Sequence, residues 1–301
     1  PADARVANTE EFSANVPVGA WSSAPNINTA RSFGGGAGIY TSALLFGGTG
    51  QPAYTEYYNG SSWTEIADLN TGKNKTLGFG LYTAAINASG DEGTPSGGSN
   101  KTELFNGSSW TEVADQNQVT EQRASVSGTS TAGLIFGGQL PGPPMQAAAE
   151  QWNGSAWTEV GDLNTARYLF SGSGTTTAGL AFGGDVDPGF RALTESWNGS
   201  SWTEVNDLNT ARAQLAGFGT SSASLATGGR SPGFQDVTED WNGASWSEVA
   251  DLSTARGIQA QNAHSGTTTN GLVYGGNNPS SLSVTEEWSS TSNTDKTIST
   301  D

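Results

Sequence analysis

The stretch 197–205, Trp-Asn-Gly-Ser-Ser-Trp-Thr-Glu-Val, decides the fold, because it or a close variant occurs five times in this 301-residue chain. Its second tryptophan recurs at intervals of 47, 47, 45 and 44 residues, as Trp63, Trp110, Trp157, Trp202 and Trp246. A shorter relative, Gly-Ala-Trp-Ser-Ser, places Trp21 a further 42 residues upstream. A second aromatic residue precedes each turn: Tyr58, Phe105, Trp152, Trp197, Trp241 and Trp288. This period indicates stacked supersecondary units rather than one irregular domain.

One unit, residues 165–209, contains four short runs separated by turn residues, and none of them has a helical period. Gly183-Gly184 ends the second run, where glycine lets the backbone turn and pack closely. Asn198-Gly199 between alternating runs is the strongest local hairpin signal. Two registers stay open, since a four-residue loop would place Trp197 opposite Trp202 and a two-residue turn would not. Four strands at this period describe a propeller blade.

The doubled glycine occurs once per unit, so the number of its copies predicts the number of blades. It occurs at Gly47-Gly48, Gly137-Gly138, Gly183-Gly184, Gly228-Gly229 and Gly275-Gly276. The missing copy is Ser89-Gly90, because residues 82–90 align with residues 40–48. The sequence therefore predicts an all-β, six-bladed propeller of four-stranded blades over residues 30–293, with blades at about 30–70, 71–117, 118–164, 165–209, 210–253 and 254–293.

The two ends of the repeat region predict a closed ring. The last unit supplies three strands through Trp288, and residues 1–29 are expected to supply the closing outer strand around Trp21. Closure would remove exposed sheet edges. Residues 9–12 copy the strand before the turn as a spare segment, and residues 294–301 form a polar tail.

Composition alone leaves a disordered acidic chain and an aromatic-cored β-protein open. Leu, Ile, Val and Phe make up 49 residues and the net charge is -17, but there are ten Trp and 42 Gly. No apolar stretch is long enough for a membrane span, and Lys+Arg 12 against Asp+Glu 29 leaves no basic surface for nucleic acid. Zero Cys excludes disulfides, thiolate metal sites and cysteine nucleophiles.

The pattern of an arginine, an apolar run, Gly-Gly, an aromatic residue, a turn and Trp resembles kelch-type β-propeller repeats over about residues 9–293. The repeat sequence Trp-Asn-Gly-Ser-Ser-Trp-Thr-Glu-Val…Asp-Leu-Asn-Thr-Ala-Arg is also similar to repeats in structural proteins of environmental, especially marine, bacteriophages. Kelch-type copper-radical oxidases need two His and a Tyr crosslinked to Cys, and this chain has one His and no Cys. The Ser-x-Asp-x-Gly-x-Thr-Trp box of sialidase propellers lacks its Asp here.

Most charges recur once per blade. Sixteen of the 29 acidic residues occupy three fixed repeat positions, and the inner strands open with Arg31, Lys73, Arg123, Arg167, Arg212 and Arg256. This regularity favours inter-blade ion pairs or hydrogen-bonding struts. The alternative is a ring of six cations around one mouth of the channel, able to hold an anion.

Catalytic and metal-ligating residues are scarce. His264 is the only histidine, so a histidine metal site cannot form, and a surface or turn role is expected for it. Residues 185–189 (Asp-Val-Asp-Pro-Gly) offer oxygen ligands for Ca²⁺ but lack the rest of a recognised loop, which favours a solvated turn. Glycosidase carboxylates are not excluded by residue type, yet no pair stands out. We therefore expect no cofactor and no metal.

Function in a repeat protein is best sought where the repeat breaks. The connection after the doubled glycine varies most, and alternating strand direction places it on one face with the Asn-Thr-Ala-Arg connections. We expect one rim there to present Tyr54, Met145, Phe190, Arg191, Arg230 and Phe234. Aromatic rings with Arg suit sugar stacking or protein docking. The alternative is that proline stiffens these loops and the aromatic rings fold back onto the blades.

These observations predict a non-enzymatic binding or structural module, on a virion surface or otherwise extracellular. As a phage fibre, appendage or decoration protein it would contact host surface glycan or another virion protein, without nucleic-acid binding or membrane insertion. The alternatives are a secreted polysaccharide-active enzyme and a bacterial surface adhesin on the same propeller.

Overall fold

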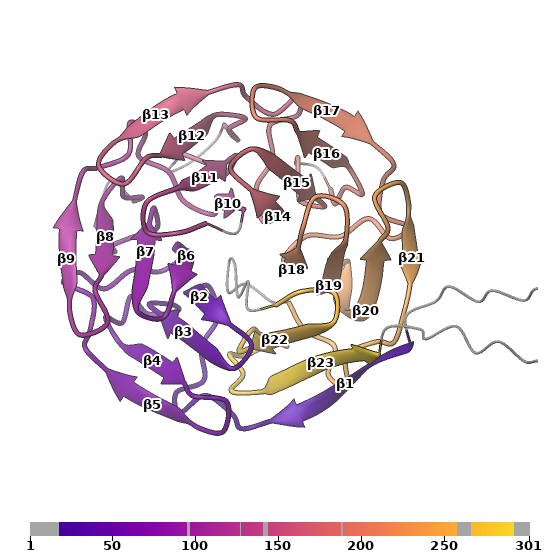
Figure 1. Ribbon diagram of the computed structural model, residues 1–301, viewed down its shortest axis with the longest axis horizontal. Coiled ribbons are helices and arrows are strands. Elements are labelled where there is room, and N and C mark those ends of the chain that lie inside the picture. The colour runs from indigo at the N-terminus through magenta and orange to yellow at the C-terminus, as the bar shows by residue number, and fades with distance from the viewer. Residues whose placement is uncertain are drawn as a thin grey trace, which may run out of the picture.

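The protein is an all-β propeller of six blades arranged around a ring (Figure 1). The computed structural model describes residues 18–94, 97–126, 128–140, 144–187, 189–257 and 266–291. These residues form 23 strands, and none of them lies in a helix that could span a membrane. The predicted fold class and blade count are therefore confirmed.

Each of the first five blades is a four-stranded antiparallel sheet, ordered along the chain from the centre of the ring outward. The strands are β2 (Gly35–Ile39), β3 (Ser42–Phe46), β4 (Thr55–Tyr58) and β5 (Trp63–Ile66); β6 (Leu77–Leu81), β7 (Ala84–Ala88), β8 (Thr102–Phe105) and β9 (Trp110–Val113); β10 (Ala124–Ser125), β11 (Gly133–Phe136), β12 (Ala149–Trp152) and β13 (Trp157–Val160); β14 (Ser171–Thr175), β15 (Ala178–Phe182), β16 (Thr194–Trp197) and β17 (Trp202–Val205); β18 (Ala216–Gly219), β19 (Ser224–Ser231), β20 (Gly233–Trp241) and β21 (Trp246–Glu248).

The sixth blade joins the two ends of the chain. Its described strands are β22 (Asn270–Tyr274), β23 (Thr285–Thr291) and, as the outer strand, β1 (Val18–Ala24). β1 pairs antiparallel with β23 and sets Trp21 opposite Trp288, which confirms closure by the N-terminal segment. The spare segment 9–12, the inner strand expected before β22 and the polar tail lie outside the described residues.

The Asn-Gly turn is a four-residue loop, which settles the open register. Trp197 lies directly opposite Trp202, and the amide of Asn198 donates to the carbonyl of Ser201 at 3.2 Å. The Asn198 side-chain oxygen accepts from the amides of Ser200 and Ser201 at 2.9 and 3.0 Å, while Gly199 adopts a φ of 95°. Asparagine and glycine are thus required by the turn itself.

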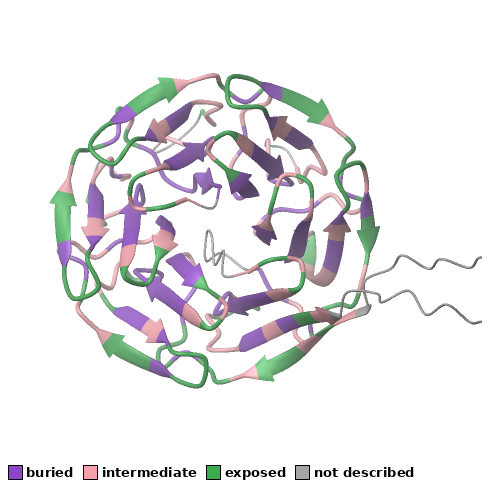
Figure 2. Ribbon diagram, viewed as in Figure 1, coloured by how far each residue is buried: buried purple, intermediate pink, exposed green. Residues whose placement is uncertain are grey.

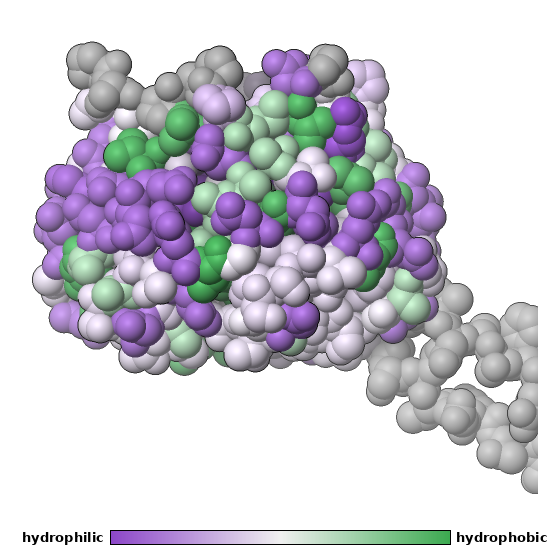
Figure 3. Space-filling model, turned by 90° about the horizontal axis from the view of Figure 1, so that it is seen from above, coloured by the Kyte–Doolittle hydropathy of each residue, from purple (hydrophilic) through white to green (hydrophobic). Residues whose placement is uncertain are grey.

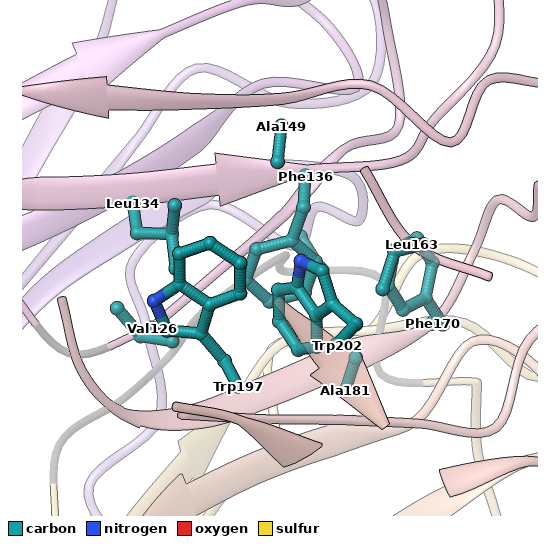
Figure 4. Packing of buried hydrophobic residues seen from close by; sticks show 10 residues of the cluster. Val126, Leu134, Phe136, Ala149, Leu163, Phe170, Ala181, Trp197 and Trp202 are labelled. Carbon is teal, nitrogen blue, oxygen red and sulfur yellow. The ribbon is translucent and has the colours of Figure 1, made fainter. Parts of the chain in front are cut away.

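The core consists of aromatic clusters between neighbouring blades. Figure 4 shows Trp197 and Trp202 of the fourth blade packed against Phe136 and Leu134 of the third. The ring centroids of Phe136 and Trp202 are 4.8 Å apart in an edge-on arrangement, which aromatic pairs favour. The inner strands are mostly buried, and among the strands the outer ones carry most of the exposed residues (Figure 2). Aromatic residues therefore compensate for the small number of aliphatic ones.

Ser89 fills the first glycine position of the second blade, as the sequence alignment predicted. It adopts a φ of 58° and Gly90 a φ of 116°, matching the 71° and 112° of Gly183 and Gly184. A residue with a Cβ is disfavoured in this left-handed region. The Ser89 hydroxyl donates to the side-chain oxygen of Gln116 at 2.7 Å, which helps to hold it there.

Candidate functional site

The two faces of the ring are built from different connections. We call the face that carries the Asn-Gly turns the turn face. The turn between β14 and β15 lies on the same face, since Gly199 packs there beside Thr177. We call the opposite face the loop face. There the connections after the doubled glycine meet those that lead into the repeated arginines, for example where the amide of Gly184 donates to the carbonyl of Arg212.

The repeated arginines lie inside the blades and form no ring of cations around the central channel. Arg31 pairs with Glu56 at 3.0 Å, Arg123 with Glu150 at 2.6 Å and Arg167 with Glu195 at 3.3 Å. The remaining two pairs are Arg212 with Glu239 and Arg256 with Glu286. All ten side chains are at most 2% exposed. The alternative prediction, a ring of six cations able to hold an anion, is therefore wrong.

Each glutamate of these pairs also links its blade to the preceding one. The second oxygen of Glu195 accepts from the backbone amide and the side-chain amide of Asn164 at 2.7 and 2.8 Å. The ion pair itself thus stays within one blade, and the inter-blade link is a hydrogen bond. Desolvation by burial lowers the pKa of Arg167 to about 10 although Glu195 raises it. Such a pair is destabilising to break, because one partner would remain buried and charged.

Arg123 reaches its glutamate from a different backbone position. The amide of Gly184 donates to the carbonyl of an arginine, whereas the equivalent Gly90 donates to Thr120. The bridges Tyr168↔Asp185 and Glu121↔Gln139 give the same alignment. Arg123 directly precedes its inner strand β10, as expected, but it stands three residues further along the blade than the other arginines do, because Thr120 holds the aligned position.

Lys73 takes the arginine's place in the second blade. It is fully buried and donates to the carbonyl of Lys101 at 2.9 Å. Burial lowers its pKa, and the nearby Glu103 opposes that shift. The second blade therefore keeps the buried cation with a carbonyl as its hydrogen-bond partner.

The other acidic positions are also structural or belong to the outer wall. A carboxylate oxygen of Asp207 accepts from the amide of Thr194 at 3.0 Å, and Asp251 accepts from Thr238 at the same distance. The glutamates that follow the turn are exposed on the outer strands: Glu65, Glu112, Glu159, Glu204 and Glu248. Charges on exposed edge strands oppose edge-to-edge pairing with other sheets.

The predicted rim residues all lie in loop-face connections, but they are spread over four of the six blades. Tyr54 is 44% exposed in the first blade, whereas Met145 in the third is half-buried. The Arg191 side chain donates to the carbonyls of Gly189 and Phe190, both at 3.3 Å. Its guanidinium is thus held by its own loop.

Only two rim residues from different strands are brought together. β19 and β20 continue beyond the ring as a hairpin in which Arg230 pairs with Phe234. The guanidinium carbon of Arg230 lies 5.9 Å from the centre of the Phe234 ring, within the range of a cation–π contact. The exposed arginine beside a half-buried ring makes this hairpin the most distinct feature of the loop face.

A cavity that we did not anticipate from the sequence lies at the turn-face end of the central channel. Its volume is about 410 Å³, within the usual range for ligand sites. Every blade contributes at least one lining residue near the turn face, and the larger or polar ones include Ile39, Phe79, Leu81, Thr175, Thr220 and Thr267. The described lining residues include no Asp, Glu, His, Lys or Arg. We call this site the channel mouth.

The channel mouth is asymmetric because the repeat breaks in the first two blades. At the end of the inner strand or directly after it, blades 4 and 5 have Thr175 and Thr220, with Thr267 at the corresponding position of blade 6, but blades 1 and 2 have Ile39 and Leu81. Ile39 is 47% and Leu81 52% exposed. The next residues are Tyr40 and Tyr82 where the other blades have Ser or Thr. Comparison of these columns could have revealed the site from sequence.

The tryptophan before the Asn-Gly turn changes in the same two blades. In the other four its indole N–H donates to the carbonyl of the first turn residue at 2.9–3.1 Å: Trp152 to Ser130, Trp197 to Thr176, Trp241 to Ser221 and Trp288 to Thr268. Blades 1 and 2 have Tyr58 and Phe105 instead. The Tyr58 hydroxyl donates to Glu287 at 3.0 Å. The tyrosine in the turn and the loss of the tryptophan before the Asn-Gly turn therefore occur together in blades 1 and 2.

Groups suited to metal binding or acid–base chemistry are few. The described residues contain no cluster of three or more His, Cys, Asp or Glu that could hold a metal ion. In the 185–189 loop the Asp185 carboxylate accepts from the amide of Asp187 at 2.9 Å, as in an ordinary turn. His264 lies outside the described residues.

Comparison with known proteins identified no relative, so the protein is classified by its fold alone. A scan against protein-family models and a search of curated proteins both found no match. The structure defines a six-bladed β-propeller, and its kelch type remains a prediction from the repeat pattern.

Proposed function

We propose that this propeller is a non-enzymatic binding and structural module on the exterior of a phage particle, where it contacts host surface glycan or another virion protein. The chemistry of the channel mouth carries the proposal. Its described lining has no side chain suited to proton transfer or nucleophilic attack near neutral pH. A neutral, partly apolar concavity suits binding.

The use of the acidic residues supports a binding role over polysaccharide hydrolysis. Glycoside hydrolases use two carboxyl groups about 5 to 9.5 Å apart beside the sugar. Here the repeated glutamates are either buried in ion pairs, like Glu195, or exposed on the outer wall, like Glu204. Neither set lines the channel mouth.

The placement on a virion rests on the wording of the repeat and its similarity to repeats of phage structural proteins. A closed ring whose outer edge carries exposed glutamates is consistent with such an exterior role. The loop-face rim, with Tyr54 and the Arg230–Phe234 hairpin, supplies the aromatic and cationic groups expected for glycan contact.

A glycan array with the purified protein tests the binding function. We expect selective retention of a glycan, weakened by Phe190→Ala and Phe234→Ala but unchanged in the control Val119→Thr, which changes an exposed aliphatic residue in the loop-face connection of another blade. Circular dichroism would show that each variant folds. Release of reducing ends from a polysaccharide would contradict the non-enzymatic role.

The virion location needs a separate measurement. Antibodies raised against the propeller should label the outside of purified phage particles that carry its gene, and particle proteomics should detect it at a fixed copy number. Its presence only in the medium of uninfected bacteria would contradict this location and favour a secreted protein.

A further inference from the structure

The aliphatic residues at the channel mouth are unusual for this chain. Five large hydrophobic side chains are exposed among the described residues, and three of them lie on the turn face in blades 1 and 2: Ile39, Leu81 and Tyr82. Leu, Ile, Val and Phe together account for only 49 of the 301 residues. Exposed hydrophobic groups that gather in one place mark interaction sites more often than scattered ones do.

The geometry of the mouth favours an apolar occupant over a sugar. The aromatic rings offer little free face, because Tyr82 stacks on Tyr57 with ring centroids 4.5 Å apart and Tyr40 packs against the buried core. The hydroxyls across the mouth are used within their own turns. The amide of Ala178 donates to Thr175 at 3.2 Å, and that of Asn270 to Thr267 at 3.3 Å.

The mouth also disfavours a charged occupant. No charged side chain is present in its described lining, so an ion placed there would lose water without gaining a counter-charge. An uncharged aliphatic or aromatic side chain would instead cover Ile39 and Leu81. Burial of one such side chain is worth about 1.5–3 kcal/mol.

The chain that carries the mouth is acidic, although its exposed glutamates lie on the outer strands and not beside the mouth. The exposed glutamates of the outer strands, such as Glu204, lie two residues from the tryptophan that follows each Asn-Gly turn. They are therefore near the periphery of the turn face, and the chain has a net charge of -17. Seen edge-on, the wall of the ring is mostly hydrophilic, with hydrophobic residues in small groups (Figure 3). Electrostatic complementarity favours basic residues on the partner outside the anchor.

We propose that the channel mouth is a docking site for a partner protein that inserts one uncharged apolar side chain between Ile39 and Leu81 and surrounds it with basic residues. This inference rests on the proposed binding function and assigns protein docking to the turn face. The loop face is then free for glycan. The apolar side chain supplies the affinity, and the basic residues supply orientation and encounter rate.

Methyl NMR of the full chain with defined peptides tests the docking site. The probe is a seven-residue peptide with a central leucine, flanked on each side by one glycine and two lysines. It should shift the methyl signals of Ile39 and Leu81 saturably, and should bind about tenfold more tightly than the same peptide with a central serine. Replacing its lysines by glutamates should weaken binding at low salt.

Variants that copy the chain's own repeat sharpen the test. Ile39→Thr with Leu81→Thr gives these positions the residue found at 175, 220 and 267, and should reduce binding of the leucine peptide about tenfold. The matched control Val119→Thr should leave binding unchanged. Equal affinity for the leucine and serine peptides, or retained binding in the double variant, would overturn the proposal.

Two further outcomes separate this inference from the proposed function. A neutral disaccharide that shifts the same methyl signals more strongly than the leucine peptide would show a sugar site and overturn protein docking. A positive glycan array with no response of the channel mouth to any peptide would leave the proposed function in place and remove only the docking site.

Discussion

Blades 1 and 2 differ from blades 3 to 6 at three linked positions. In the latter four, an indole N–H holds the carbonyl of the first turn residue, and that turn presents Ser or Thr residues. In blades 1 and 2 the indole is replaced by Tyr58 or Phe105, and the turns carry Tyr40 and Tyr82 after Ile39 and Leu81. The difference teaches that a blade keeps its architecture when this hydrogen bond is lost, which leaves its turn available for other residues.

Removal of a buried arginine should have the largest effect. Arg212→Met leaves Glu239 buried without its cation and should lower the free energy of unfolding by about 3–5 kcal/mol. The matched variant Lys73→Met should cost clearly less, because Lys73 donates to a backbone carbonyl rather than to a carboxylate. Urea denaturation of both variants measures the difference. Equal losses would show that the cation of blade 2 is as firmly paired as those of the other blades.

Loss of the indole hydrogen bond should come next. Trp197→Phe converts blade 4 to the arrangement of blade 2 and removes the bond to the Thr176 carbonyl together with part of a packed ring. We expect a loss of about 1–2 kcal/mol and faster amide exchange in the turn after β14. Phe105→Leu is a control that changes ring packing without a hydrogen bond. Unchanged exchange in Trp197→Phe would show that the indole does not hold the turn.

One junction between complete blades lacks a hydrogen bond that others have. The outer-strand indole N–H donates to a threonine of the preceding blade in Trp110–Thr55, Trp157–Thr102 and Trp246–Thr194. Trp202 faces Ala149 at that position, and its N–H is buried without a partner among the described residues.

Ala149→Thr should supply that partner and stabilise the protein by about 1 kcal/mol. Thermal unfolding measures the gain, and Ala149→Val, which has the same shape without a hydroxyl, is its control. Equal stability of the two variants would contradict the hydrogen-bond explanation.

A half-buried carboxylate should make blade 5 sensitive to pH. Asp240 lies between Leu225 and Ser247, and desolvation raises its pKa from 3.8 to about 6. Its contribution to stability is present when it is protonated, below about pH 4, and is lost as the pH rises through 6. Asp240→Asn should therefore stabilise the protein by about 1 kcal/mol at pH 7.5, after allowance for solvent screening, and by nothing at pH 3.5.

The pH dependence of unfolding, measured on Asp240→Asn beside the wild type, checks this prediction. The equivalent position of blade 1 is Tyr57, which stacks on Tyr82 and is not a carboxylate. A stabilisation that persisted at pH 3.5 would assign the effect to packing.

The smallest effect on stability is expected at the channel mouth. Ile39→Thr with Leu81→Thr changes two side chains that are about half exposed, so unfolding should shift by less than about 0.5 kcal/mol. A larger loss, measured by urea denaturation, would show that these residues stabilise their blades rather than serve a partner.

Several details of the fold depended on contacts between residues far apart in the chain. The Asn-Gly signal predicted the hairpin but not its register, because both loop lengths fit the same residues; in the structure Trp197 lies opposite Trp202 and both pack against the neighbouring blade. Arg123 aligned by residue type with the other arginines, yet Thr120 holds the equivalent backbone position. A long side chain can reach one carboxylate from either place.

The candidate site shows the same limit. Variation in the loops drew attention to Tyr54, Phe190 and Phe234, but sequence variation does not report whether side chains converge. Ile39 and Leu81 are 42 residues apart and line one cavity only because the inner strands β2 and β6 end at the same face of the ring. The aligned turns, Gly-Ile-Tyr-Thr-Ser and Gly-Leu-Tyr-Thr-Ala against Gly-Thr-Thr-Thr-Ala, contained the signal.

The all-β class, the six blades, the aromatic core and the closing strand follow from the sequence, because the repeat period and turn residues act locally and recur in every unit. The burial of particular charges, the strand registers and the residues that share the channel mouth became known only from the folded ring. These properties depend on how neighbouring blades pack and on which strand ends the ring brings together, and no single repeat contains that information.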